Sequence, residues 1–192
     1  MKVGFIGLGN VGGKLAGSLL RNGMDLSVHD LNGSFVADFV SRGAKDGSSP
    51  AQLMQDCDAV ITCLPSPAAC DAVVSEMLPH VGPGKIWMEM STTDASEVKR
   101  LGALVLAAGG EAVDCPVSGG CHRADTGNIS IYAGCTRATF DKVLPILTHM
   151  GRRILHVGEI GNSSTLKVMT NYLATANLIT VCEALTVIKA AG

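Results

Sequence analysis

The chain has 192 residues, of which 47% are hydrophobic, 4% are aromatic and 23 are glycines, and its formal net charge is −2. This composition is typical of a compact α/β domain and excludes a disordered or collagen-like chain. The sequence contains no basic cluster, so it predicts neither a nucleic-acid partner nor binding to a membrane surface.

The first dozen residues predict a strand, a tight glycine turn and a helix. Residues 3–6 form an apolar run, and Gly7, Gly9 and Gly12 follow it with the spacing G-x-G-x-x-G. Apolar residues then recur with helical periodicity. This is the context of a dinucleotide-binding turn, in which the backbone approaches a pyrophosphate at a helix N-terminus. The predicted cofactor-binding residues of this turn are Gly7, Leu8, Gly9, Asn10, Val11 and Gly12.

A second predicted strand, residues 26–30, ends in an acid that lies 18 residues after Gly12. In dinucleotide-binding folds, a carboxylate at about this place binds a ribose hydroxyl. Residues 31–34 include no Arg or Lys that would receive a 2′-phosphate, and Asp30 would repel one. We therefore expect NAD in preference to NADP, although Arg42 lies one helix away.

Strands and helices then alternate at short spacing. Strands are predicted over 58–64, 85–89, 111–115, 129–133 and 153–157, and helices over 35–40, from Pro50, from Pro67 to about Met77, over 95–108 and over 138–150. A continuous apolar run such as 58–64 is typical of a strand covered on both faces. The pattern predicts an α/β fold with a doubly wound, mostly parallel sheet of the Rossmann type.

Ligands bind at the carboxyl edge of such a sheet, and three strand ends carry candidate residues. The first has Leu64 and Pro65, the second has Ser91 followed by Thr92, and the third leads into Ser118-Gly119-Gly120. A Ser-Gly-Gly turn exposes consecutive backbone N–H groups, which makes it a natural seat for a carboxylate. A plain structural turn is the alternative interpretation.

Residues 162–191 are predicted to form one long helix that is apolar around most of its circumference. Lys167, Asn171, Asn177 and Glu183 interrupt it too often for a membrane span. We expect a second subunit or a further domain to bury it. Lys167 and Asn171 share one face, and a desolvated lysine can exchange a proton with a substrate hydroxyl. An ordinary surface lysine is the alternative.

The seven cysteines form no C-x-x-C pair, and their odd number argues against a disulfide framework. The same spacing argues against a zinc site, so no metal is predicted. Cys57, Cys63, Cys70 and Cys182 lie in apolar stretches. We expect them to be buried and reduced, in a cytoplasmic protein.

Together these residues resemble the β-hydroxyacid dehydrogenases of the 3-hydroxyisobutyrate dehydrogenase type. The motifs that carry the resemblance are Gly7-Leu-Gly-Asn-Val-Gly12, Ser91-Thr92, Asp114-x-Pro-Val-Ser-Gly-Gly120, and Gly158-x-x-Gly161 with Lys167-x-x-x-Asn171. The resemblance implies NAD(P)-dependent oxidation of a small β-hydroxy acid to its semialdehyde, or the reverse. It implies that Lys167 is the catalytic acid/base and that Asn171 holds substrate near it. It also implies that Ser118, Gly119 and Gly120 bind the substrate carboxylate and that Leu64, Pro65 and Thr92 contact the cofactor.

The chain departs from the family pattern at several positions. Ser163 and Cys135 replace glycines, Thr170 replaces an asparagine, and His122 and Arg123 follow the Ser-Gly-Gly turn, where family members vary. Family members also continue into an all-helical domain. We therefore expect a truncated form, with a dinucleotide-binding domain over residues 1–160 and the start of the helical domain over residues 161–192. We expect it to form a homo-oligomer through the C-terminal helix.

Two alternatives to this function stay open. A decarboxylating dehydrogenase of the phosphogluconate type would need basic phosphate-binding residues, which the sequence does not show. A cofactor-binding or interaction module with little or no turnover would explain the short chain and its apolar helix. The pair Lys167 and Asn171 favours the enzyme, whereas the missing domain favours the module.

Overall fold

Six parallel strands form the central sheet of this computed structural model, which describes residues 1–192. The strand order is β3-β2-β1-β4-β5-β6, so the direction in which strands are added reverses between β1 and β4. This confirms the predicted doubly wound α/β fold. The strands are β1 (Lys2–Ile6), β2 (Asp25–His29), β3 (Lys45–Asp46), β4 (Ala59–Thr62), β5 (Ile86–Glu89) and β6 (Glu111–Asp114).

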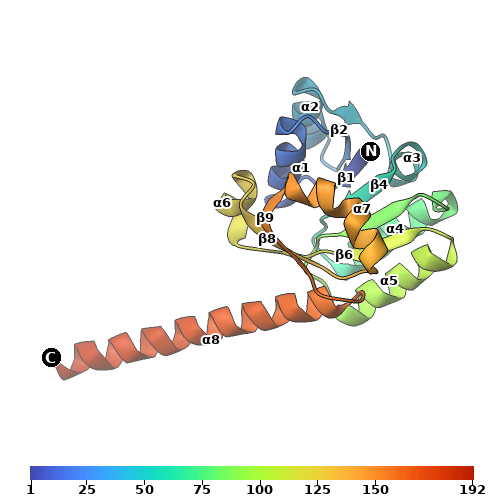
Figure 1. The fold of residues 1–192 in the computed structure, drawn as a ribbon. Coiled ribbons are helices and arrows are strands. Elements are labelled where there is room, and N and C mark those ends of the chain that lie inside the picture. Colours follow the sequence, from blue (N-terminus) through green and yellow to red (C-terminus); the bar gives the residue numbers. More distant parts are fainter.

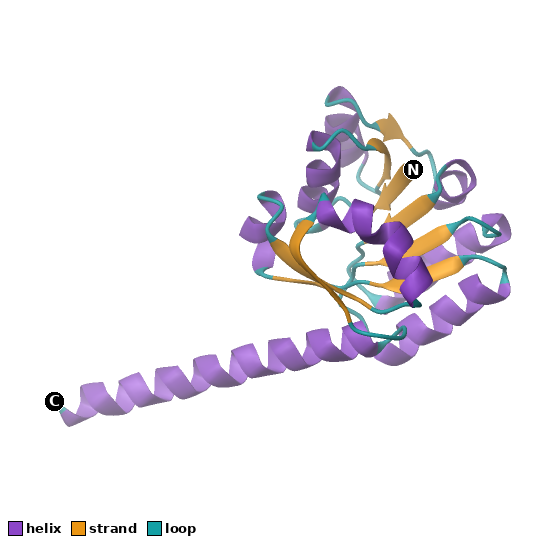
Figure 2. Ribbon diagram, viewed as in Figure 1, coloured by secondary structure: helices purple, strands orange, loops and turns teal.

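Helices cover both faces of this sheet (Figure 1, Figure 2). One apolar core lies under α1 (Gly12–Arg21), α2 (Gly33–Ser41) and α7 (Arg137–Thr148), and it includes Val3, Phe5 and Ile61 from the strands. The other lies under α3 (Pro50–Asp56), α4 (Pro67–Met77) and α5 (Ala95–Ala107), and it includes Val60 and Trp87. Successive strand residues point to opposite covered faces, so every residue of the central strands β4 and β5 is buried, whereas both residues of the edge strand β3 are exposed.

A second, three-stranded sheet lies beside the first. Its order is β7 (Val117–Ser118), β8 (Ile129–Ala133) and β9 (Gly151–His156), with β7 antiparallel and β9 parallel to β8. The short helix α6 (Gly120–Asp125) lies between β7 and β8 in the chain. The sequence predicted the two longer strands but neither their separate sheet nor α6. A backbone bridge between Asp114 and Gly134 joins the two sheets.

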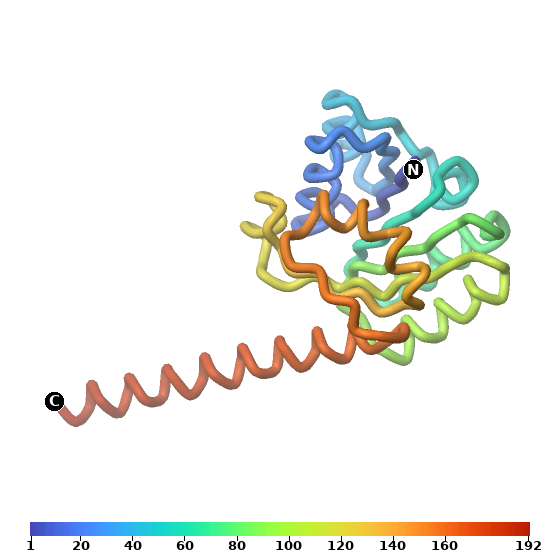
Figure 3. The backbone as a smooth tube through the Cα atoms, viewed as in Figure 1, coloured from blue at the N-terminus to red at the C-terminus, as the bar shows by residue number.

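The last helix, α8 (Asn162–Ala191), extends away from the domain, and the C-terminus lies at its far end (Figure 1, Figure 3). Its only buried residues are Ser163 and Ser164. Nothing in this chain covers the rest of the helix, and the expectation that a second subunit or a further domain buries it stays a prediction. The prediction that Cys182 is buried is wrong, because it lies on the exposed part of α8.

By length and composition, α8 is the one helix that would be able to cross a membrane. Its most apolar stretch has a mean hydropathy of 1.4, and none of that stretch is buried. Core helices of soluble proteins can have the same composition. The absence of a membrane partner therefore stays a prediction.

Candidate functional site

A cavity of about 760 Å³ opens at the carboxyl ends of β1, β2, β4 and β5. Ligand pockets typically have volumes of about 300–1,000 Å³. The cavity lies where the strand order reverses, which is the usual ligand position in such sheets. Predicted site residues that line it are Gly7, Gly9, Asn10, Val11, Gly12, Asp30, Leu64, Pro65, Thr92, Gly120 and Lys167. Those that do not line it are Leu8, Ser118, Gly119 and Asn171.

The three glycines of the first turn have different surroundings. Gly7 has a φ of +95°, and a Cβ there would collide with the carbonyl oxygen of Cys63. A Cβ on Gly12 would collide with the carbonyl oxygen of Gly7. At Gly9 an added Cβ would meet no protein atom within 4 Å, because this residue faces the open cavity. Gly7 and Gly12 are therefore required by the fold, whereas Gly9 leaves room for a ligand.

The N-terminus of α1 presents unpaired donors to the same space. The backbone N–H groups of Asn10, Val11 and Gly12 donate to no backbone acceptor, and no side chain caps this helix. Such groups, together with the positive end of the helix dipole, favour an anion. The geometry of this turn therefore fits the pyrophosphate of a dinucleotide.

Asp30 lies at the end of β2 and is already held by the backbone. Its two carboxylate oxygens accept hydrogen bonds from the N–H of Leu8 at 2.6 Å and of Asn32 at 2.8 Å. The side chain of Leu8 belongs to the apolar core, so only its backbone takes part in the site. Asp30 thus fixes the glycine turn to the end of β2 and also presents its charge to the cavity.

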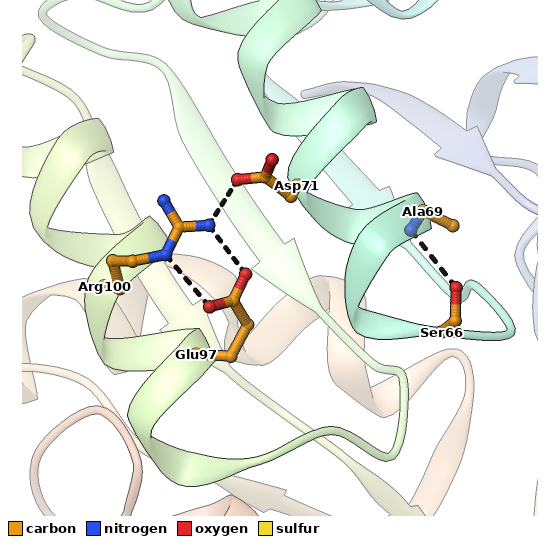
Figure 4. Close-up of polar contacts among 5 residues, drawn as sticks. All are labelled: Ser66, Ala69, Asp71, Glu97 and Arg100. Carbon is orange, nitrogen blue, oxygen red and sulfur yellow. Dashed lines mark hydrogen bonds and ion pairs between the residues drawn. The ribbon is translucent and has the colours of Figure 1, made fainter.

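The turns after β4 and β5 are tied to each other. The N–H of Leu64 donates to Ser91 Oγ at 2.7 Å, and the N–H of Ala69 donates to Ser66 Oγ, which caps α4. Figure 4 shows this cap, and it shows Arg100 on α5 paired with Glu97 of the same helix and with Asp71 on α4. These contacts cap the start of α4, whose residues form part of the cavity wall, and join this helix to α5.

A buried carboxyl group lies beneath these turns. Glu89 is 1% exposed and accepts hydrogen bonds from the N–H of Ser91 at 2.6 Å and from Thr62 Oγ1 at 2.8 Å. Trp87 Nε1 donates in turn to Thr62 Oγ1 at 2.9 Å. Burial raises the pKa of Glu89, and the hydrogen bonds oppose that rise. The sequence pattern did not single out this residue.

The Ser118–Gly120 turn forms the junction of β7 and α6. Gly119 has a φ of +133° and Gly120 a φ of +78°, and the backbone N–H groups of both have no acceptor. Of these three residues, only Gly120 lines the cavity. The turn thus has free donors at one edge of the cavity, as its sequence predicts, but only one of its three residues reaches the wall.

Lys167 is the one residue of α8 that lines the cavity. Desolvation lowers the pKa of its amine, and the structure records no acidic partner for it. Asn171 lies one turn further along the helix and is exposed. The structure therefore places Lys167 in the wall of the cavity that the glycine turn also lines, but leaves Asn171 outside that wall.

Some wall residues were not predicted. Leu31 and Phe35 follow β2, and Ala72, Val73 and Glu76 come from α4. The sequence could have indicated these residues only through their position in the chain, because they follow turns that were predicted to bind the ligand. Burial raises the pKa of Cys63, another wall residue, to about 12, so its thiol is neutral at physiological pH.

Comparisons with known proteins agree with this geometry. Residues 2–158 match the NAD-binding domain of 6-phosphogluconate dehydrogenase. A protein of Dictyostelium discoideum named "probable 3-hydroxyisobutyrate dehydrogenase, mitochondrial" is 32% identical over 186 residues, which cover 95% of this chain and 58% of that protein. The cytokine-like nuclear factor N-PAC of Homo sapiens is 29% identical over 194 residues, covering 100% of this chain and 35% of that protein.

A solved structure leads to the same family. Mycobacterium tuberculosis 3-hydroxyisobutyrate dehydrogenase with L-serine has a TM-score of 0.92 at 25% identity, and the match covers 95% of this chain and 63% of that one. The chain thus spans less than two thirds of the length of each of these relatives. With its glycine turn, Asp30 and Lys167 placed around one cavity, the chain belongs to the family of the NAD-binding domain of 6-phosphogluconate dehydrogenase, and its resemblance to the β-hydroxyacid dehydrogenases is confirmed.

Proposed function

We propose that this chain carries the cofactor site and the catalytic lysine of an NAD-dependent oxidoreductase that interconverts a small β-hydroxy acid and its semialdehyde. The observation that carries the proposal is the place of Lys167. Lys167 lines the same cavity as the glycine turn and Asp30. Desolvation lowers the pKa of its amine. The proposed cofactor site and the proposed proton-transfer group thus line the same cavity.

The proposed roles of the residues follow from their donors and charges. The N–H groups of Asn10, Val11 and Gly12 bind the pyrophosphate, and the turns at Leu64–Pro65 and Thr92 contact the rest of the cofactor. The bound nicotinamide supplies the hydride acceptor in oxidation and the hydride donor in reduction. In oxidation the neutral amine of Lys167 accepts the hydroxyl proton, and in reduction its ammonium returns it.

Recognition of the substrate carboxylate is proposed for the free N–H groups of the Ser118–Gly120 turn. Gly120 reaches the cavity wall, and backbone N–H groups in a turn bind carboxylates well. Asn171 is proposed to hold the substrate next to Lys167, as the resemblance implies. It would do so from the exposed surface of α8, one helical turn beyond Lys167.

The preference for NAD over NADP is proposed from the charges near the expected position of the adenosine ribose. Asp30 lines the cavity at the end of β2. Arg42 is already paired with Asp38 at 3.0 Å and lies over the ring of Phe39, so it does not offset the negative charge of Asp30. A 2′-phosphate would meet the carboxylate of Asp30 without a basic partner. Titration of the protein with NADH and NADPH tests this, and equal or tighter binding of NADPH would contradict it.

The activity is tested by reduction of NAD in the presence of 3-hydroxyisobutyrate, glycerate, serine or threonine. We expect oxidation of at least one of them, with a rate that rises with pH because the neutral amine is the base. Its apparent pKa should lie below the ordinary lysine value of about 10.4. Lys167→Ala should lower kcat by roughly 10²–10⁴-fold and leave NADH binding unchanged.

Two outcomes of this experiment would count against the proposal. Turnover that persists in Lys167→Ala would remove the lysine from the mechanism. Tight NADH binding without turnover of any hydroxy acid would favour a cofactor-binding module.

A further inference from the structure

Asp114 belongs to a motif of the family pattern, yet the proposed function assigns it no role. It ends β6 and is 1% exposed. Its backbone exchanges two hydrogen bonds with Gly134 at the end of β8, at 3.0 and 2.8 Å, and so joins the two sheets. The backbone of Asp114 is therefore held by both sheets.

The carboxylate of Asp114 accepts three hydrogen bonds from the start of α8. The donors are the N–H of Gly161 at 3.0 Å, the N–H of Ser164 at 2.9 Å and the hydroxyl of Ser164 at 2.8 Å. No side chain of α8 itself caps this end, since the N-cap residue is Gly161. The carboxylate satisfies N–H groups that the helix leaves unpaired, and it lies at the positive end of the helix dipole.

This contact determines where α8 points. Ser163 and Ser164 are its only buried residues, so the helix is held to the domain by its first turn. Lys167 lies three residues after Ser164, on the same side of the helix, and it lines the cavity. A small tilt of the first turn would move the amine along the cavity wall.

We propose that Asp114 is a positioning residue for Lys167, whose carboxylate holds the first turn of α8 against the ends of β6 and β8 and thereby directs the amine into the cofactor cavity. The inference rests on the proposed function of Lys167. The same residue lies three positions before β7, where the Ser118–Gly120 turn begins. The carboxylate itself contacts only Gly161 and Ser164, at the start of α8.

Ser163 provides a matched control. It is buried in the same turn as Ser164, but its hydroxyl has no hydrogen-bond partner. Its Oγ lies 2.8 Å from the place that a Cβ of Gly134 would occupy, so the glycine makes room for it. Ser163→Ala and Ser164→Ala remove the same atom from adjacent positions, and only the second change removes a hydrogen bond to Asp114.

The first test measures the pKa of Lys167 in the protein without substrate. Trace labelling with acetic anhydride over a range of pH, followed by peptide mass spectrometry, reports the pKa of the individual amine. We expect Asp114→Asn to raise the pKa of Lys167 toward the ordinary lysine value, because a loosened first turn exposes the amine to water. Ser164→Ala should give a smaller rise, and Ser163→Ala should give none.

Other results of the labelling would overturn the proposal. An unchanged pKa in Asp114→Asn means that the carboxylate does not position the amine. A lowered pKa means that only the lost negative charge acts on it. Ser164→Ala retains the carboxylate and two of the three hydrogen bonds, so it tests the proposal even where Asp114→Asn does not fold.

The second test uses turnover of a hydroxy acid that the wild type oxidises. We expect Asp114→Asn to lower kcat by roughly ten- to a hundredfold, since a displacement of about 1 Å can cost about 10²-fold. The Kd for NADH should stay within about twofold, because Asp114 does not line the cavity. An unchanged kcat would overturn the proposal. A wild type without turnover would contradict the proposed function alone, because the labelling result does not depend on it.

Discussion

Gly9 and Gly12 lie three residues apart in one turn, yet they are glycines for different reasons. The space beside Gly12 is filled by the carbonyl group of Gly7, whereas the space beside Gly9 is the cavity itself. The spacing G-x-G-x-x-G predicts both roles from the sequence, because the strand and helix around it fix how the turn runs.

This difference yields a prediction for two variants with the same chemical change. Gly12→Ala should destabilise the protein by about 1–3 kcal/mol or more, because its methyl group collides with fixed backbone. Gly9→Ala should leave stability within about 0.5 kcal/mol but weaken NADH binding at least tenfold, because its methyl group enters the ligand space. Thermal unfolding and NADH titration of both variants measure this. Wild-type affinity in Gly9→Ala would show that the pyrophosphate lies elsewhere.

Residues at the ends of strands were predicted better than residues whose side-chain direction depends on packing. Asp30, Leu64 and Thr92 reach the cavity because the carboxyl ends of parallel strands meet at one edge. Leu8 instead turns its side chain into the core. Asn171 lies about 6 Å further along α8 than Lys167, which takes it out of the cavity. Neither outcome can be derived from spacing alone.

Two neighbouring strands, β4 and β5, are linked at their carboxyl ends by Glu89. Its carboxyl group joins Thr62 on β4 to the N–H of Ser91 after β5. Ser91 in turn accepts the N–H of Leu64, so the network ends in two cavity-lining turns. The sequence around Glu89 shows only an acid at the end of an apolar strand. The sequence does not predict its hydrogen bond to Thr62, because that bond depends on β4 and β5 being neighbours in the sheet.

The raised pKa of Glu89 predicts how stability depends on pH. Between the unfolded value of about 4.3 and the raised folded value, the folded state holds a proton that the unfolded state releases. Stability therefore falls as pH rises through this window. Glu89→Gln should lack this fall, so its stability relative to wild type should increase from about pH 4 upward. Urea unfolding over a pH series measures it, with exposed Glu76→Gln as the control. A constant difference between Glu89→Gln and wild type across that series would contradict the prediction.

The long strands and helices of the central sheet were predicted from their apolar periodicity, within a few residues at each end. The elements that were missed are short: β3 and β7 have two residues each, and α6 has six. Such segments carry too few residues to show a period, and long-range pairing determines them. The separate sheet of β8 and β9 also depends on tertiary packing.

The shape of the chain as a whole is dominated by one exposed helix (Figure 1). Leu178 is 64% exposed and Leu185 is 61% exposed. Val181, which lies between them in the chain, and Ile188, which follows them, are also exposed. These four residues repeat with alternating spacings of three and four, which places them along one side of α8. This spacing is that of the seam through which two helices pack. We therefore propose a second copy of this chain as the occupant of the seam, which agrees with the expected homo-oligomer.

This proposal predicts the oligomeric state of the protein in solution. The wild type should be a dimer or larger by light scattering, and Leu178→Glu combined with Leu185→Glu should make it monomeric, because two charges in the seam repel their copies. Binding of NADH should persist, since neither residue lines the cavity. Thr180→Glu adds a charge to α8 at a position outside the seam and should leave the oligomer intact. A monomeric wild type that instead binds to uncharged lipid vesicles would show that α8 meets a membrane, as its length and hydropathy allow.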